Sequence, residues 1–193
     1  ADLKTQGWEL DLAWRDRIAG AGNFHYELHF ILSDNISRIT KYNNPNKLIN
    51  TYYDGMRVGD IWGYVNDGYF KDADDIAKSA DQTLIRVSSA NKPLPGDIKF
   101  KDLNGDGKIS AGNGTVADPG DMRVIGNSLP RLPFGLNANA GFKNFFFSVF
   151  FHGVGMRDWW PGTDASLFWG QYNRPYSWMP QAVLDNEWSE TNP

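Results

Sequence analysis

Residues 8–15 read WELDLAWR and residues 24–33 read FHYELHFILS, and both stretches alternate in chemistry from one residue to the next. In each, every second side chain is Trp, Phe, Tyr or Leu, and the side chains between them are mostly charged, polar or small. A period of two places these two sets on opposite faces of a β-strand. The connecting residues 19–23 read AGAGN, a turn-forming run. We therefore predict a β-hairpin.

A second hairpin is predicted far downstream. Residues 134–142 and 145–152 alternate in the same way around a tight Lys143-Asn144 turn. The turns within the hairpins are short, but 92 residues, 39–130, lie between the hairpins and 36 follow residue 157. This asymmetry is typical of transmembrane β-barrels, whose strands alternate over roughly ten residues. A soluble antiparallel sandwich shows the same alternation, so the pattern alone leaves both classes open. The dense aromatic face, opposite small and ionisable groups, favours the barrel.

Composition excludes several classes. The chain has 19 basic and 23 acidic residues and no basic block, so it lacks the footprint of a nucleic-acid binder. It has no Cys, which excludes a disulfide scaffold and a thiolate zinc site. No run approaches the roughly 20 apolar residues of a membrane helix, so a membrane role would rest on strands.

No catalytic motif is present. The chain has no nucleophile elbow, phosphate loop or zincin motif. His25 and His29 lie four residues apart, which in a strand separates them by about 13 Å, too far to share a metal directly. We expect that the chain is not an enzyme.

The most specific motif is DLNGDGKIS at residues 102–110, which fits the first nine positions of an EF-hand-type calcium loop. Calcium takes six to eight oxygen ligands, and alternate acidic or amide side chains followed by Gly107 suit that geometry. The expected Glu at position twelve is replaced by Asn113, but Asp118 and especially Asp121 could supply the missing carboxylate if residues 111–120 loop out. We expect bound calcium, with ligands from Asp102, Asn104, Asp106, Lys108 (through its carbonyl), Ser110 and Asp121. The alternative is an Asx-rich turn without metal.

Other segments of the long connection also carry local order. Residues 52–70 predict short strands and turns, residues 72–80 a two-turn helix with Asp72 as N-cap, and residues 97–100 a short strand. The last segment is rich in aromatics that could stack on sugar rings or anchor a partner, or could simply pack the loop or form an interfacial girdle. The binding candidates there are Trp159, Trp160, Trp169, Tyr172 and Trp178.

Many separate motifs, in order along nearly the whole chain, closely resemble SusC/RagA-type TonB-dependent outer-membrane transporters. They are Gly7-Trp8-Glu9, Trp14-Arg15-Asp16, Ser33-Asp34-Asn35, Tyr53-Asp54-Gly55-Met56, Ile61-Trp62-Gly63-Tyr64, residues 95–107, Ile125-Gly126-Asn127, Pro130-Arg131 and Phe151-His152-Gly153-Val154-Gly155. The resemblance implies an all-β fold: antiparallel hairpins from a large transmembrane barrel with long extracellular loop insertions. It also implies a gene that continues on both sides of these residues.

The same resemblance implies how the chain is divided. Residues 1–38 would form one barrel hairpin, 39–130 an extracellular insertion with the calcium-type loop, 131–157 a second barrel hairpin and 158–193 a Trp-rich extracellular loop. In the family an acidic residue shortly before the Ile-Gly-Asn motif closes the metal loop, a position that Asp121 occupies.

The function implied is import of glycans or peptides across the outer membrane of a Gram-negative bacterium. A SusD-like surface lipoprotein, the TonB complex and outer-membrane lipid would be the partners, the TonB complex acting through parts that these motifs do not include. The alternative is a secreted, soluble, calcium-dependent carbohydrate-binding β-module, which would have to bury its aromatic strand faces against a second sheet.

Overall fold

The structure is a computed structural model that describes residues 1–18, 20, 23–86, 92–161, 181 and 185. Contacts divide the chain into two units. The first contains Ala1–Asn43, Tyr53–Asp60 and Gly126–Asp158, and the second includes Asn44–Tyr52 and Ile61–Ile125. Among the residues so described, no helix is both long enough and apolar enough to span a bilayer.

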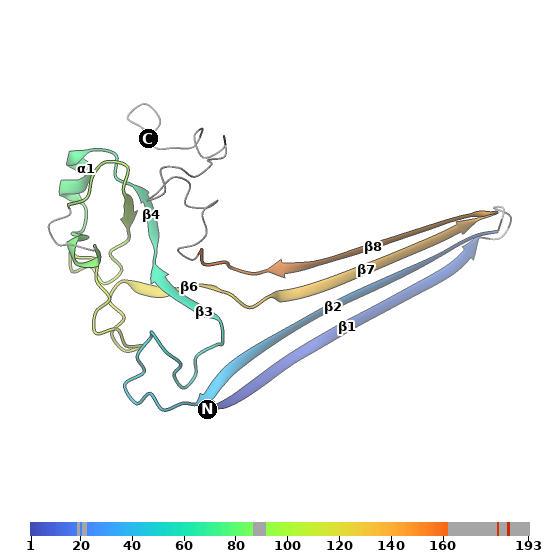
Figure 1. The fold of residues 1–193 in the computed structure, drawn as a ribbon, viewed down its shortest axis with the longest axis horizontal. Helices are drawn as coiled ribbons and strands as arrows, with labels where there is room; N and C mark the ends of the chain where they lie inside the picture. The colour runs from blue at the N-terminus through green and yellow to red at the C-terminus, as the bar shows by residue number, and fades with distance from the viewer. Residues whose placement is uncertain (19, 21–22, 87–91, 162–180, 182–184, 186–193) are drawn as a thin grey trace, which may run out of the picture. The chain divides into compact units, whose positions relative to one another are not determined.

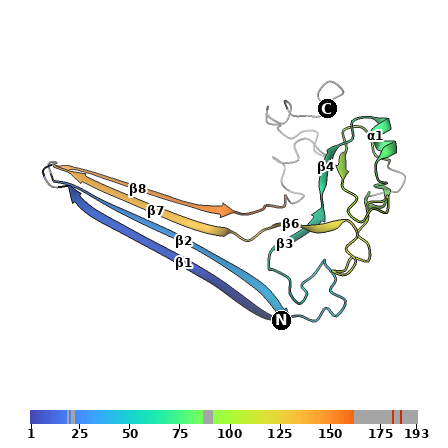
Figure 2. The same cartoon turned by 180° about the vertical axis from the view of Figure 1, so that it is seen from behind.

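The first unit is built on one antiparallel sheet of four long strands (Figures 1 and 2). The order is β1 (Asp2–Ile18), β2 (Phe24–Lys41), β7 (Arg131–Phe142) and β8 (Phe145–Met156). The predicted all-β antiparallel class and both hairpins are confirmed. β1 and β2 extend beyond the alternating stretches, because backbone pairing continues from Gly7↔Asn35 to Lys4↔Arg38 where the aromatic pattern has ended. The division of the chain at residues 38, 130 and 157 stays a prediction.

The strand register places the apolar sets of all four strands on one face. Side chains directly opposite in an antiparallel pair share a face, and the pairings join Leu12, Phe30, Leu136 and Phe151 into one transverse row. The adjacent positions form a row on the other face: Ala13, His29, Asn137 and Phe150. We call the first face the apolar face and the second the polar face, although β8 also contributes Phe to the polar face.

The apolar face is open to solvent across the sheet. The side chain of Leu12 is 55% exposed, that of Trp14 62% and that of Phe151 56%. The tight turn from β7 to β8 is confirmed, with Lys143 at a positive φ of 53°.

A charge pair joins the two hairpins. Arg131 donates from Nε and Nη2 to the two carboxylate oxygens of Asp34, a bidentate geometry. The two residues lie on neighbouring strands, and both side chains are largely buried. This pair therefore locks β2 against β7 where the long connection enters and leaves the sheet.

The second unit contains short elements around a small core. β3 (Asp60–Tyr64) pairs with β6 (Met122–Asn127), and β4 (Asn66–Tyr69) pairs with β5 (Ile98–Phe100). Helix α1 (Ala73–Lys78) begins after Asp72, whose side chain accepts from the Asp75 amide, as predicted. A 3₁₀ turn, η1, covers Thr83–Ile85.

The core of this unit is formed by the fully buried Phe70 and Ile109. Beside them, buried Gln82 donates to the Ile98 carbonyl and accepts from the Phe100 amide, so its side chain acts as a hydrogen-bonding partner for β5. This core and β5 hold the start of the calcium-type loop.

Candidate functional site

The calcium-type loop is coiled around its own side-chain oxygens. The Asp102 carboxylate accepts from the Gly105 amide at 2.6 Å and from the Gly107 amide at 2.8 Å. Both glycines adopt a positive φ, 78° and 79°, which is the conformation that favours glycine and lets the chain turn back on itself. Asn104 and Asp106 accept, in turn, from the amides two residues further on. The spacing therefore produces successive Asx-type turns.

Asp121 closes the loop from a distance. Its side chain is fully buried; Oδ1 accepts from the Leu103 amide at 2.7 Å and Oδ2 from the Ser110 amide at 2.9 Å. The Asp121 amide donates back to the Ser110 carbonyl at 2.8 Å. One carboxylate thus fastens both ends of the motif, and we call this arrangement the Asp121 clamp.

The intervening residues 111–120 loop out, and glycine makes their return possible. Gly120 has a φ of 55°, and a Cβ there would lie 2.3 Å from the Ser110 carbonyl oxygen. Only a residue without a side chain can bring the strand this close to the loop. Asp121 could reach the motif only if these residues looped out, and the backbone follows such a course.

The donor set fits a hard cation in its chemistry. The predicted ligands offer carboxylate, amide, hydroxyl and carbonyl oxygens, which calcium prefers, and a carboxylate oxygen that accepts one N–H keeps a second lone pair. In the part of the chain that the structure describes, however, no three His, Cys, Asp or Glu side chains are grouped so that they could hold a metal. As placed, the acids bind backbone amides, and calcium stays a prediction.

Charged groups of the surrounding unit are perturbed by their neighbours. Lys99 donates to Asp75 at 3.1 Å and, by this hydrogen bond above all, lowers the pKa of the Asp75 carboxyl. Burial raises the pKa of the Tyr64 hydroxyl, with a further contribution from the negative charge of Asp121.

The predicted binding aromatics are only partly visible. Trp159 and Trp160 are exposed, at 64% and 62%. Trp169, Tyr172 and Trp178 lie outside the described residues.

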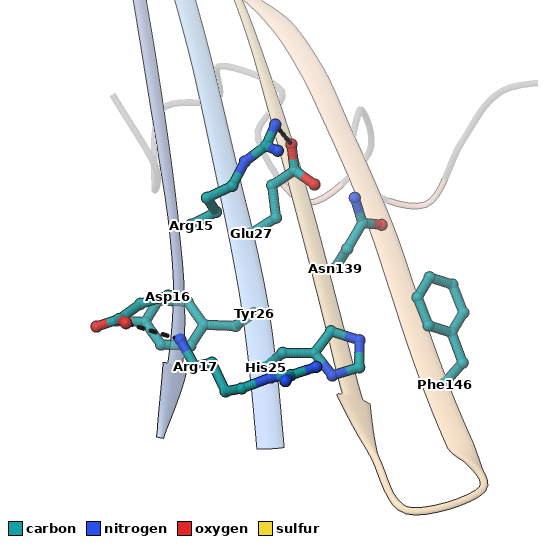
Figure 3. A pocket seen from close by; sticks show the side chains of 8 residues that line it. All are labelled: Arg15, Asp16, Arg17, His25, Tyr26, Glu27, Asn139 and Phe146. Carbon is teal, nitrogen blue, oxygen red and sulfur yellow. Dashed lines mark hydrogen bonds and ion pairs between the residues drawn. The ribbon is translucent and has the colours of Figure 1, made fainter. Parts of the chain in front are cut away.

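Near the hairpin turns the sheet carries a hollow of about 500 Å³, lined mainly by residues of the polar face (Figure 3). Arg15 and Glu27 point toward one another across it, with 3.5 Å between guanidinium and carboxylate. Its lining residues are Arg15, Asp16, Arg17, His25, Tyr26, Glu27, Asn139 and Phe146. None of the eight is a Ser, Thr or Cys, and the Tyr26 phenol is the one hydroxyl group in this lining. The lining carries side chains of both positive and negative charge, which is typical of a surface in contact with water.

The sequence alone did not indicate two features of the first unit. One is the Asp34–Arg131 pair, and the other is a cross-strand row formed by Lys4, Arg38 and Arg57. Neither set shares a motif, so the strand register is the only signal that brings its members together.

No family model matches the chain. It is similar to TonB-dependent receptor P39 of Formosa agariphila, at 26% identity over 179 residues that cover 78% of this chain and 16% of that protein. It is also similar to TonB-dependent receptor P26 of the same organism, at 27% identity over 155 residues, 79% of this chain and 15% of that protein. The chain spans about a sixth of the length of these curated relatives. The chain is thus related to TonB-dependent receptors, over a limited part of their length.

Proposed function

We propose that this chain is part of a SusC/RagA-type TonB-dependent importer in the outer membrane of a Gram-negative bacterium. The observation that carries the proposal is the apolar face, which is continuous over β1, β2, β7 and β8 and remains exposed. A soluble carbohydrate-binding module would bury such a face, whereas a bilayer would cover it with acyl chains.

The dimensions of the apolar face support lipid as its environment. On β2 the apolar positions run from Phe24 to Leu32. Eight steps of about 3.4 Å give roughly 27 Å of strand, or about 21 Å of height at a tilt near 40°, against a band of about 25 Å in outer-membrane barrels. The opposite face offers groups such as His29 and Asn137, which suit a polar lumen.

The cargo and the partners follow from the motif resemblance. We propose glycans or oligopeptides as the imported substrates, a SusD-like surface lipoprotein as the extracellular partner and the TonB complex as the energy source. Trp159 and Trp160, together with the predicted Trp169, Tyr172 and Trp178, are the proposed substrate or lipoprotein contacts, because flat aromatic rings bind sugar rings and protein partners well.

The proposal is tested by following the product of the complete gene in its bacterium. We expect the protein in the outer-membrane fraction, and we expect uptake of a fluorescent oligosaccharide or oligopeptide library to fall to background when either this gene or the TonB component is deleted. Deletion of an unrelated outer-membrane porin serves as the control. A protein found in the soluble secreted fraction, or uptake that is independent of TonB, would contradict the proposal.

We further propose that calcium binds the loop at residues 102–110 and stiffens it by neutralising its carboxylates. Binding to the folded state alone stabilises by about 2.7 kcal/mol when calcium is at 100 times its Kd. Millimolar calcium should therefore raise the melting temperature of the native chain, and the double variant Asp102→Ala/Asp106→Ala should lose that rise in differential scanning calorimetry. The matched control is Asp67→Ala/Asp74→Ala, which removes two exposed acids of the same unit. A rise that survives in the loop variant would remove calcium from this site.

A further inference from the structure

Three cations lie side by side at the end of the sheet away from the hairpin turns. Lys4 of β1 is paired with Arg38 of β2, and Arg38 forms an antiparallel bridge with Arg57. The hydrogen bonds Ile39 N to Met56 O and Val58 N to Ser37 O, both 2.9 Å, flank that bridge. Arg38 and Arg57 are therefore a non-hydrogen-bonded pair, the type in which side chains approach most closely. We call Lys4, Arg38 and Arg57 the cation row.

The cation row has no acidic partner in the described part of the chain. The ion pairs there involve other residues, and none joins Lys4, Arg38 or Arg57 to a carboxylate within 4.0 Å. The Arg38 guanidinium donates a 3.4 Å hydrogen bond to the Gly55 carbonyl, which is uncharged. Like charges directly opposite on a sheet repel one another. An external anion would remove this repulsion.

The cation row lies beside a hollow of about 470 Å³. The residues that line it are Lys4, Gln6, Ile36, Arg38, Ile39, Thr40 and Gly55. Lys4 and Arg38 are exposed there, and Arg57, the next position along the row, is half-buried. The hollow therefore offers room for a headgroup directly against two of the cations.

The cation row continues the apolar face. Along β1 the alternation runs from Lys4 through Gln6 to Trp8 and Leu10, all on one side of the strand. Lys4 lies about 14 Å beyond Trp8 at roughly 3.4 Å per residue. The nearest acid on this face of β2, Asp34, is already held by Arg131. A ligand here meets positive charge at one end and aromatic or aliphatic surface at the other.

We propose that the cation row binds the phosphate of an anionic lipid of the outer leaflet, whose acyl chains lie over Trp8, Leu10 and Leu12. Short turns mark the periplasmic ends of outer-membrane strands, which places the opposite end, and the cation row, at the outer surface. Arginine forms bidentate bonds with phosphate oxygens, and lysine adds a point charge. This inference rests on the proposed membrane location and names the lipid that it recruits.

The test compares lipid binding by the full-length product of the complete gene, purified in neutral detergent. The variant is Lys4→Gln/Arg38→Gln/Arg57→Gln, and the control is Lys71→Gln/Lys78→Gln/Lys92→Gln, which removes the same charge outside the sheet. Native mass spectrometry measures the retention of phosphatidic acid and of phosphatidylcholine with identical acyl chains. Far-ultraviolet circular dichroism and urea unfolding verify that each variant is folded, and Arg38→Lys is the second variant in case the triple substitution prevents folding.

The native protein and the control should retain phosphatidic acid at a concentration roughly ten times lower than the concentration needed for phosphatidylcholine. In the triple variant this difference should shrink to about twofold or less. Arg38→Lys keeps the charge but loses the fork of donors, and should weaken the preference by about threefold. A triple variant that keeps the full preference, or a native protein without one, would overturn the proposal. Displacement of the lipid by millimolar inorganic phosphate would identify a simple anion site instead, and would also overturn it.

A flotation assay separates failure of this proposal from failure of the proposed function. If the native protein floats with pure phosphatidylcholine vesicles but shows no preference for phosphatidic acid, the lipid site alone is refuted. If it floats with no vesicle of either composition, the membrane location is refuted and the lipid site with it.

Discussion

Replacing Leu136 by Arg should destabilise the protein in a bilayer by about 2–4 kcal/mol, the cost of a cation near the midplane on the lipid side of a barrel. Leu136 lies one row from the middle of the apolar face, between Phe30 and Phe151. Its neighbour Asn137 lies on the polar face, between His29 and Phe150, and Asn137→Arg should leave stability nearly unchanged. Urea unfolding of the full-length protein in phospholipid vesicles measures both effects.

A depth series makes this prediction specific for lipid. Phe145 begins β8 beside the tight turn and shares the apolar face, but lies at the end of the strand. Phe145→Arg should cost only about 0–1 kcal/mol, because the penalty falls toward the interface. In a soluble core the cost would follow burial rather than depth. Equal losses at positions 136 and 137, or no decrease toward position 145, would speak against a lipid-facing sheet.

The second large effect is expected at the Asp121 clamp. Asp121→Ala removes the acceptor of the Leu103 and Ser110 amides in a fully buried position. Each buried donor left without a partner costs about 1–3 kcal/mol, so the loss should be about 2–6 kcal/mol. Asp121→Asn keeps one acceptor oxygen and should lose less. Thermal unfolding in the presence of a chelator isolates this structural contribution from any effect of calcium.

Asp118→Ala is the matched control for the clamp. Asp118 is exposed, and its carboxylate accepts only at 3.2 Å from Asn113 and 3.4 Å from Gly120. Its loss should lower stability by less than about 1 kcal/mol. Hydrogen exchange locates the damage, because the Leu103 and Ser110 amides should exchange much faster in Asp121→Ala than in Asp118→Ala. Comparable exchange in the two variants would show that the buried carboxylate does not organise the loop.

Local patterns predicted local structure well. Alternation marked all four long strands, and Asp72 marked the start of α1. These features depend on residues within a few positions of one another, where side-chain period and capping chemistry act directly. The spacing within residues 102–110 likewise indicated a loop organised by side-chain oxygens, although the metal itself stays untested.

Long-range features could not be predicted in the same way. A period of two identifies the faces of a strand but not its partner or register. The pairing of Leu32 with Phe134, the Asp34–Arg131 pair and the cation row all depend on that register. The extension of β1 to Asp2 could not be predicted for a related reason, because hydrogen bonding to β2 continues through residues without a hydrophobic pattern.

The long connection inserted between two neighbouring strands has a consequence for the order of assembly. Each hairpin closes a loop of a few residues, an event of microseconds, whereas joining β2 to β7 must bring together the ends of the 89 residues between Lys41 and Arg131. That closure entropy grows with the logarithm of the segment length and is smaller if the segment has already collapsed upon itself. The two hairpins should therefore form early, and the seam between them, with its guanidinium–carboxylate fork, should form late. The rate-limiting step in forming this sheet is then the folding of the connecting residues, which are not part of the sheet.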